Sequence, residues 1–74
     1  MRYTVMVEGQ PILELGFLRN LDTAKQQGER VAADHPDAEV CIDGYPETAG
    51  PTPTWRFDRE IEDWVSTRRL NRWL

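Results

Sequence analysis

The segment TWRFDREIEDWV, residues 54–65, decides the fold of this chain, because it is compatible with either a β-hairpin or a helix. In a hairpin, Trp55 and Phe57 alternate along the first strand, residues 59–62 form the turn, and Trp64 lies opposite Phe57. An aromatic cross-strand pair of this kind contributes on the order of 0.5–1 kcal/mol. We therefore predict a hairpin.

A helix over residues 58–73 is the alternative interpretation. Its acidic residues come first and its arginines last, an order that suits the helix dipole. Its apolar residues fit less well. Ile61, Trp64 and Val65 share one face at about 100° per residue, whereas the apolar residues of 70–74 point to other sides. No single apolar stripe covers the segment, so the hairpin is favoured and the helix stays open.

The first eighteen residues predict another hairpin, with its turn near residues 8–11, EGQP. Apolar and polar residues alternate on both sides of that turn, as they do in half-buried strands. The strands direct these apolar side chains to one face: Tyr3, Val5 and Val7 from residues 2–8, and Leu13, Leu15 and Phe17 from residues 12–18. Gly16 inside the second strand indicates a bulge or a bend.

Between the two hairpins the sequence predicts one helix, over residues 23–35. Asn20 or Asp22 can cap its amino end, and Pro36 ends it. Its buried stripe consists mostly of small residues at helical spacing: Ala24, Gly28, Val31, Ala32 and His35. Small residues allow a helix to lie close to a sheet but bury little apolar area themselves.

A third strand follows over residues 37–43, with Ala38, Val40 and Ile42 on one face. Two glycines and three prolines then predict an exposed loop over residues 44–53, and residues 67–74 form a tail. The predicted fold is α+β, a single domain over residues 1–74. One antiparallel sheet carries one helix on one face, in the order ββαββ or ββαβββ.

Composition limits the function classes. The chain has 74 residues, of which 39% are apolar and 30% charged, as in one globular domain. A net charge of −4 repels phosphate backbones, so general binding of nucleic acid is not expected. One cysteine allows no internal disulfide, and no segment resembles a membrane span or a signal peptide. We expect a cytoplasmic protein.

Chemical signatures are missing from the sequence. Cys41 and His35 are the one conceivable nucleophile and base, and they cannot meet if Cys41 faces away from the helix. The carboxylates near residue 61 lie in an exposed turn, where no pocket is implied. Their spacing fits no calcium loop. We expect no catalytic residue, no metal and no cofactor, because so small a chain cannot enclose a reaction centre.

The sheet face opposite the helix is predicted to be partly apolar. Five residues project from it: Met6, Ile12, Leu18, Cys41 and Val65. An exposed apolar face usually marks an interface, so either a homodimer through the sheet or a docked protein partner is expected. The alternative is that the tail folds back over this face.

The helix segment LDTAKQQGERVA, residues 21–32, followed by the closing segment 54–65, resembles small phage-encoded anti-CRISPR proteins of ββαβββ type. The resemblance implies a non-enzymatic inhibitor, encoded by a phage or mobile element, that docks on a host defence complex, the CRISPR effector. Fold analogy alone does not establish such a function.

Aromatic and arginine side chains dominate interface energies, and carboxylates can imitate a phosphate track. The residues predicted to contact the partner are Trp55, Arg56, Arg59, Glu60, Glu62, Asp63, Trp64, Arg68 and Arg69. Two alternatives remain. One is a single-stranded nucleic-acid-binding protein that uses the Arg/Trp-rich final third. The other is a structural homodimer.

Overall fold

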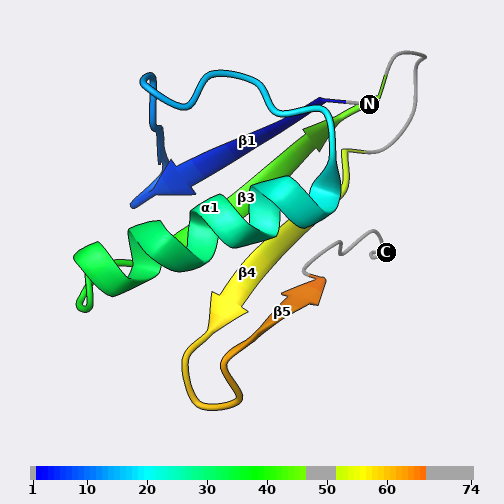
Figure 1. Ribbon diagram of the computed structural model, residues 1–74. Helices are drawn as coiled ribbons and strands as arrows, with labels where there is room; N and C mark the ends of the chain where they lie inside the picture. The colour runs from blue at the N-terminus through cyan, green and yellow to red at the C-terminus, as the bar shows by residue number, and fades with distance from the viewer. Residues whose placement is uncertain (1, 47–51, 67–74) are drawn as a thin grey trace.

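One helix lies on one face of a five-stranded antiparallel sheet in the computed structural model, which describes residues 2–46 and 52–66 (Figure 1). The elements are β1 (Arg2–Val7), β2 (Gln10–Pro11), α1 (Leu21–Asp34), β3 (Val40–Tyr45), β4 (Thr54–Asp58) and β5 (Asp63–Ser66). The strand order across the sheet is β2-β1-β3-β4-β5. The α+β fold and the order ββαβββ are therefore confirmed.

The closing hairpin forms as predicted. Strands β4 and β5 pair antiparallel, with Trp55 opposite Ser66 and Phe57 opposite Trp64. The rings of Phe57 and Trp64 lie 5.1 Å apart between centroids. This pairing excludes a helix over residues 58–66, and the remainder of the alternative helix lies outside the described residues.

Helix α1 begins at Leu21, two residues earlier than predicted, and its cap is Asn20. The Oδ1 atom of Asn20 accepts the backbone N–H of Asp22 at 2.7 Å and that of Thr23 at 3.3 Å. Two amide groups that would otherwise lack a partner at the first turn are thereby satisfied. The helix ends at Asp34, and His35 is its C-cap residue, exposed rather than part of the buried stripe.

The core lies between α1 and the sheet. Val5, Val40 and Ile42 are fully buried on the helix-facing side of β1 and β3, as the alternation predicts. Ala24, Gly28 and Ala32 are the buried residues of α1. Because these helix residues are small, the sheet approaches closely, and a Cβ atom at Gly28 would lie 2.6 Å from Cη2 of Trp64.

The predicted second strand over residues 12–18 is wrong. Strand β2 ends at Pro11, and the chain then runs through turns along the outer edge of β1 towards α1 (Figure 1). Pro11 has no N–H to continue a ladder. Gly16 adopts a φ of 62°, a left-handed conformation that interrupts a strand. The segment still shields β1, since Ile12 donates its N–H to the Val5 carbonyl at 3.0 Å.

The faces predicted for this segment are wrong as well. The residues that pack against the core are spaced by three, as in a turn, and not by two: Ile12, Leu15 and Leu18. Leu13 and Phe17, predicted to face the core, are instead 83% and 61% exposed. Ile12 and Leu18 consequently do not belong to the sheet face opposite the helix.

Two element boundaries also differ from the prediction, the start of the third strand and the start of the loop that follows it. Strand β3 starts at Val40, because the chain bends at Ala38, and it continues to Tyr45. The amide of Gly44 donates to the Pro53 carbonyl at 2.8 Å, so the loop predicted over residues 44–53 is shorter at its start. The interior of that loop, 47–51, and the tail 67–74 lie outside the described residues.

Candidate protein-binding surface

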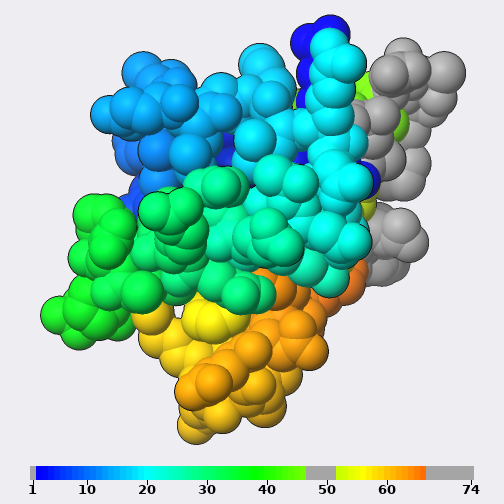
Figure 2. All heavy atoms as spheres, in the orientation of Figure 1, coloured from blue at the N-terminus to red at the C-terminus, as the bar shows by residue number. Residues whose placement is uncertain are grey.

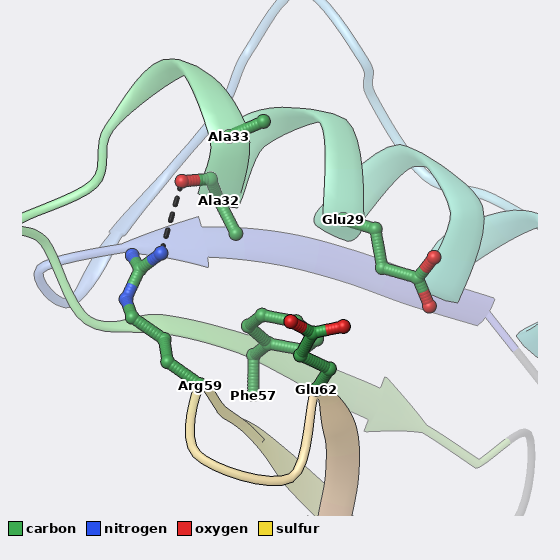
Figure 3. A pocket seen from close by; sticks show the side chains of 6 residues that line it. All are labelled: Glu29, Ala32, Ala33, Phe57, Arg59 and Glu62. Carbon is green, nitrogen blue, oxygen red and sulfur yellow. Dashed lines mark hydrogen bonds between the residues drawn. The ribbon is translucent and has the colours of Figure 1, made fainter.

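A groove of about 320 Å³ separates the second half of α1 from the β4–β5 hairpin (Figure 3). Its walls come from both elements: Glu29, Ala32 and Ala33 from α1, and Phe57, Arg59 and Glu62 from the hairpin. Figure 2 shows the helix across the middle of the molecule, with the turn of the hairpin projecting beyond it. Two of the predicted contact residues, Arg59 and Glu62, line the groove.

The guanidinium of Arg59 forms hydrogen bonds within the fold. One guanidinium nitrogen donates to the Ala32 carbonyl at 3.0 Å, and the other donates to the carbonyls of His35 and Ala38 at 2.8 and 2.6 Å. The last carbonyls of a helix have no helical partner and carry the negative end of its dipole. Arg59 therefore fastens the hairpin turn to the end of α1.

The two described tryptophans that were predicted to bind a partner also face inward. Trp64 is 9% exposed, and its indole N–H donates to the Glu29 carboxylate at 3.2 Å. Trp55 is half-buried against the core, with its ring 5.9 Å from that of Tyr3. Trp64 is therefore buried and Trp55 half-buried, so only Trp55 leaves part of its ring open to a stacking partner.

The other predicted contact residues are divided between two places. Glu60, Glu62 and Asp63 are exposed around the hairpin turn. Arg56 lies on the opposite sheet face, beside Cys41 and Val65. Arg68 and Arg69 lie outside the described residues. Within residues 2–46 and 52–66, the predicted set therefore forms an acidic turn and a separate arginine, not one continuous surface.

Cys41 is poorly placed to act as a nucleophile. It alternates with Val40 and Ile42, so its side chain points away from α1, whereas His35 caps that helix. Burial raises the pKa of the Cys41 thiol, and the carboxylates of Glu39 and Asp43 raise it further against the opposing effect of Arg56. A raised pKa reduces the fraction of reactive thiolate.

No group of three or more His, Cys, Asp or Glu side chains in the described part of the chain could hold a metal ion. No helix there has the length and apolar character needed to cross a membrane.

An apolar surface that the sequence analysis missed lies beside β1. We name it the Phe17 patch, after its members Leu13, Phe17 and Tyr45, which are 83%, 61% and 41% exposed. The rings of Phe17 and Tyr45 meet edge to face with centroids 5.8 Å apart, and the Arg2 guanidinium lies 5.8 Å from the Phe17 centroid. One sequence signal could have revealed this patch. The residues that pack on the core are spaced by three, at Ile12, Leu15 and Leu18, which leaves Leu13 and Phe17 on the outside.

The Phe17 patch surrounds a pocket of about 190 Å³. The lining is predominantly apolar: Thr4, Pro11, Ile12, Leu13, Gly16, Phe17 and Tyr45. Large apolar side chains that gather around a hollow at the surface are characteristic of interaction sites. The patch is consequently a candidate interaction site within the described part of the chain.

The chain matches no protein-family model, no curated protein and no solved structure in the comparisons made.

Proposed function

We propose that this chain is a non-enzymatic protein-binding module that contacts its partner through the Phe17 patch. The observation that carries the proposal is the exposure of Leu13, Phe17 and Tyr45 around one pocket. Burying a side chain of this size contributes about 1.5–3 kcal/mol relative to leaving it in water. A complex in which a partner covers the patch is stabilised by this free energy.

The backbone beneath the patch favours tight binding, because it is held in place before any partner arrives. Tyr3 and Leu18 exchange two backbone hydrogen bonds, of 2.7 and 2.8 Å, which tie the end of the turn segment to β1. Phe17 lies next to this bridge and contacts the ring of Tyr45. A surface ordered in advance loses less conformational entropy on association.

For the partner, we propose a host defence complex of the CRISPR effector class, with the chain acting as a phage or mobile-element inhibitor. The acidic hairpin turn supports this choice, since Glu60, Glu62 and Asp63 are exposed and can imitate phosphates in a basic groove. The order ββαβββ is compatible with it, although a fold alone does not specify a partner.

The test is capture of purified CRISPR effector complexes by the immobilised chain, followed by calorimetry with any complex retained. Phe17→Ser should weaken the association by at least ten-fold, which corresponds to about 1.4 kcal/mol. Gln26→Ser is the control, because Gln26 is exposed on α1 and belongs neither to the Phe17 patch nor to the acidic turn. Equal loss from both variants would contradict a contact through the Phe17 patch.

The role of the acidic turn is tested separately. Replacing Glu60, Glu62 and Asp63 by their amides should slow association and reduce its dependence on salt, because exposed charges mainly steer the encounter. If no effector complex binds at any salt concentration, the proposed partner class is wrong.

A further inference from the structure

The turn between β4 and β5 exposes a large apolar side chain, that of Ile61. Four large apolar side chains are exposed in the described part of the chain, and three of them form the Phe17 patch. Ile61 is the fourth and is 61% exposed. Two exposed carboxylates, those of Glu60 and Glu62, flank it in the sequence. The turn therefore presents one branched aliphatic side chain between two negative charges.

The Phe17 patch has the complementary shape and charge. Its pocket of about 190 Å³ is predominantly apolar, and a cavity of about 150 Å³ already holds benzene, so one aliphatic side chain can enter it. The Arg2 guanidinium lies 5.8 Å from the Phe17 centroid and places a positive charge beside the pocket. Arg19 adds a second positive charge next to Arg2, because the antiparallel bridge Tyr3–Leu18 aligns residues 2 and 19.

The two arginines are not neutralised within residues 2–46 and 52–66. Neither Arg2 nor Arg19 forms an ion pair with a residue in these ranges. The acidic residues of these ranges that are nearest to the patch in the sequence, Glu14 and Asp43, do not line the pocket. Glu14 lines a different hollow, on the side of the chain where His35 lies. The surface around the pocket thus suits an apolar side chain accompanied by carboxylates.

We propose that the Phe17 patch binds the β4–β5 turn of a second copy of this chain, with Ile61 in the pocket and the flanking carboxylates beside the two arginines. A chain cannot fill its own pocket. The patch lies where β1 begins and β3 ends, whereas the turn follows the end of β4, at the opposite end of the strands (Figure 1). The contact joins two different surfaces, so it is head-to-tail and can repeat from copy to copy.

The association is weak, because one aliphatic side chain and exposed ion pairs contribute little against the entropy lost on association. We expect a dissociation constant on the order of 1 mM, so that the chain is monomeric when dilute. The contact does not depend on the class of partner proposed above. Because that partner is proposed to use the same patch, it should compete with the second copy.

The first test is dilution of the ¹⁵N-labelled chain from about 2 mM to about 0.05 mM, followed by NMR. The amide signals of Gly16 and Phe17 should shift with concentration, and those of residues 60–62 should shift over the same range. Translational diffusion should be slower in the concentrated sample. Signals that do not depend on concentration, or that shift at only one of the two surfaces, would overturn the proposal.

A pair of complementary variants gives the decisive test. Phe17→Ser removes a wall of the pocket, and Ile61→Ser removes the side chain that enters it. Each variant alone should remain monomeric at about 2 mM. A mixture of the two should associate and stop at two copies, because the first variant keeps an intact turn and the second keeps an intact pocket. A mixture that stays monomeric would contradict the proposal.

Labelling one variant at a time assigns the two surfaces in the mixture. In labelled Phe17→Ser, the signals of residues 60–62 should shift, and in labelled Ile61→Ser, those of Gly16 and Phe17 should shift. Leu13→Ser is a second pocket variant, for use if Phe17→Ser does not fold, since Leu13 is 83% exposed. Gln26→Ser, at an exposed position of α1, is the control and should associate like the parent chain.

The charges are tested by Arg2→Glu. This change should weaken the association at least three-fold at low salt, because it replaces an attraction by a repulsion. Arg30→Glu makes the same change of charge at an exposed position of α1 and should leave the affinity within about two-fold of the parent value. Equal effects of the two variants would show that Arg2 does not meet the carboxylates of the turn.

This proposal and the proposed function fail in different ways. If Phe17→Ser abolishes capture of the effector complex but the mixed variants do not associate, the proposed function stands and the contact between copies is wrong. If the mixed variants associate but Phe17→Ser leaves capture intact, the patch is an interface between copies and the proposed contact surface for the partner is wrong.

Discussion

At the scale of single residues, Gly28 determines how closely α1 approaches the sheet. A Cβ atom there would lie 2.6 Å from Cη2 and 2.7 Å from Cζ2 of Trp64. Overpacking a core costs about 1–3 kcal/mol, which exceeds the roughly 1 kcal/mol that alanine gains over glycine in a helix. Gly28→Ala should therefore lower the free energy of unfolding, by up to about 2 kcal/mol, as measured in urea.

The control for Gly28→Ala is Gln26→Ala, at an exposed position of the same helix. That change should alter stability by no more than about 0.5 kcal/mol. A Gly28→Ala variant more stable than the parent chain would mean that helix propensity outweighs the contact with Trp64.

The thiol of Cys41 should make both stability and alkylation depend on pH. Burial, followed by Glu39 and Asp43, raises the thiol pKa in the folded chain above its unfolded value. The neutral thiol is thus favoured by folding. Its contribution to stability is fully present below the unfolded pKa and is lost as pH rises through the folded pKa. Alkylation of the folded chain by iodoacetamide should have a higher pH midpoint than alkylation in concentrated urea.

The neighbouring carboxylates allow a direct check of that cause. Asp43→Asn removes one of the negative charges that raise the thiol pKa, so alkylation at a fixed pH should become faster. A midpoint in the folded chain at or below the midpoint in urea would contradict the effect of burial on Cys41.

At the scale of elements, Arg59 joins the hairpin to the helix. Arg59→Ala removes three hydrogen bonds, to carbonyls in the last turn of α1 and in the segment that follows it. Because Arg59 is exposed and water competes for these groups, the expected loss is about 1–2 kcal/mol. Amide hydrogen exchange should also accelerate in the last turn of α1, which NMR can follow residue by residue.

Arg59→Lys separates charge from geometry. Lysine keeps the favourable charge near the helix end but lacks the planar fork that reaches several carbonyls at once. It should restore only part of the lost stability. Arg30→Ala, at an exposed position of α1, is the control and should have little effect. Full recovery with lysine would show that the helix dipole alone matters.

The two hairpins show why one could be predicted from sequence and the other could not. In the closing hairpin, alternation, turn length and the aromatic pair Phe57–Trp64 all favour the same register. In residues 12–18, the alternation is equally good, but Pro11 and Gly16 prevent a continuing ladder. Backbone chemistry overrides the side-chain pattern there.

The corrected faces of residues 12–18 can be tested by a matched pair. Leu15 is half-buried against the core, so Leu15→Ala should cost about 1–2 kcal/mol. Leu13 is 83% exposed, and Leu13→Ala should change stability by no more than about 0.5 kcal/mol. Urea unfolding of both variants decides the matter. Equal losses would favour the two-residue alternation of a strand.

At the scale of the whole molecule, the sequence predicts the layers better than the candidate site. The layers follow from apolar alternation and from the small residues of α1, which are local patterns. The site depends on which surface stays uncovered, and this follows from contacts between distant segments. Phe17 meets Tyr45, and Arg59 meets Ala32, across separations that no local pattern encodes.

The corrected faces of residues 12–18 also weaken the prediction of a homodimer through the sheet. With Ile12 and Leu18 assigned to the core side, three of the five residues predicted on the opposite face remain there: Met6, Cys41 and Val65, which form one cross-strand row with Arg56. A dimer through this row would have to remove the guanidinium of Arg56 from water, which is unfavourable. The parent chain should therefore be a monomer in dilute solution.

Replacing that one arginine should reverse the outcome. Arg56→Leu makes the row from Met6 to Val65 continuously apolar, so self-association should appear at concentrations where the parent chain is monomeric. Arg56→Gln removes the charge but keeps the position polar, and it should remain monomeric. Size-exclusion chromatography with light scattering measures all three proteins. A dimer of the parent chain would show that this face tolerates Arg56 in an interface, and a monomeric Arg56→Leu variant would show that the row is too narrow to associate.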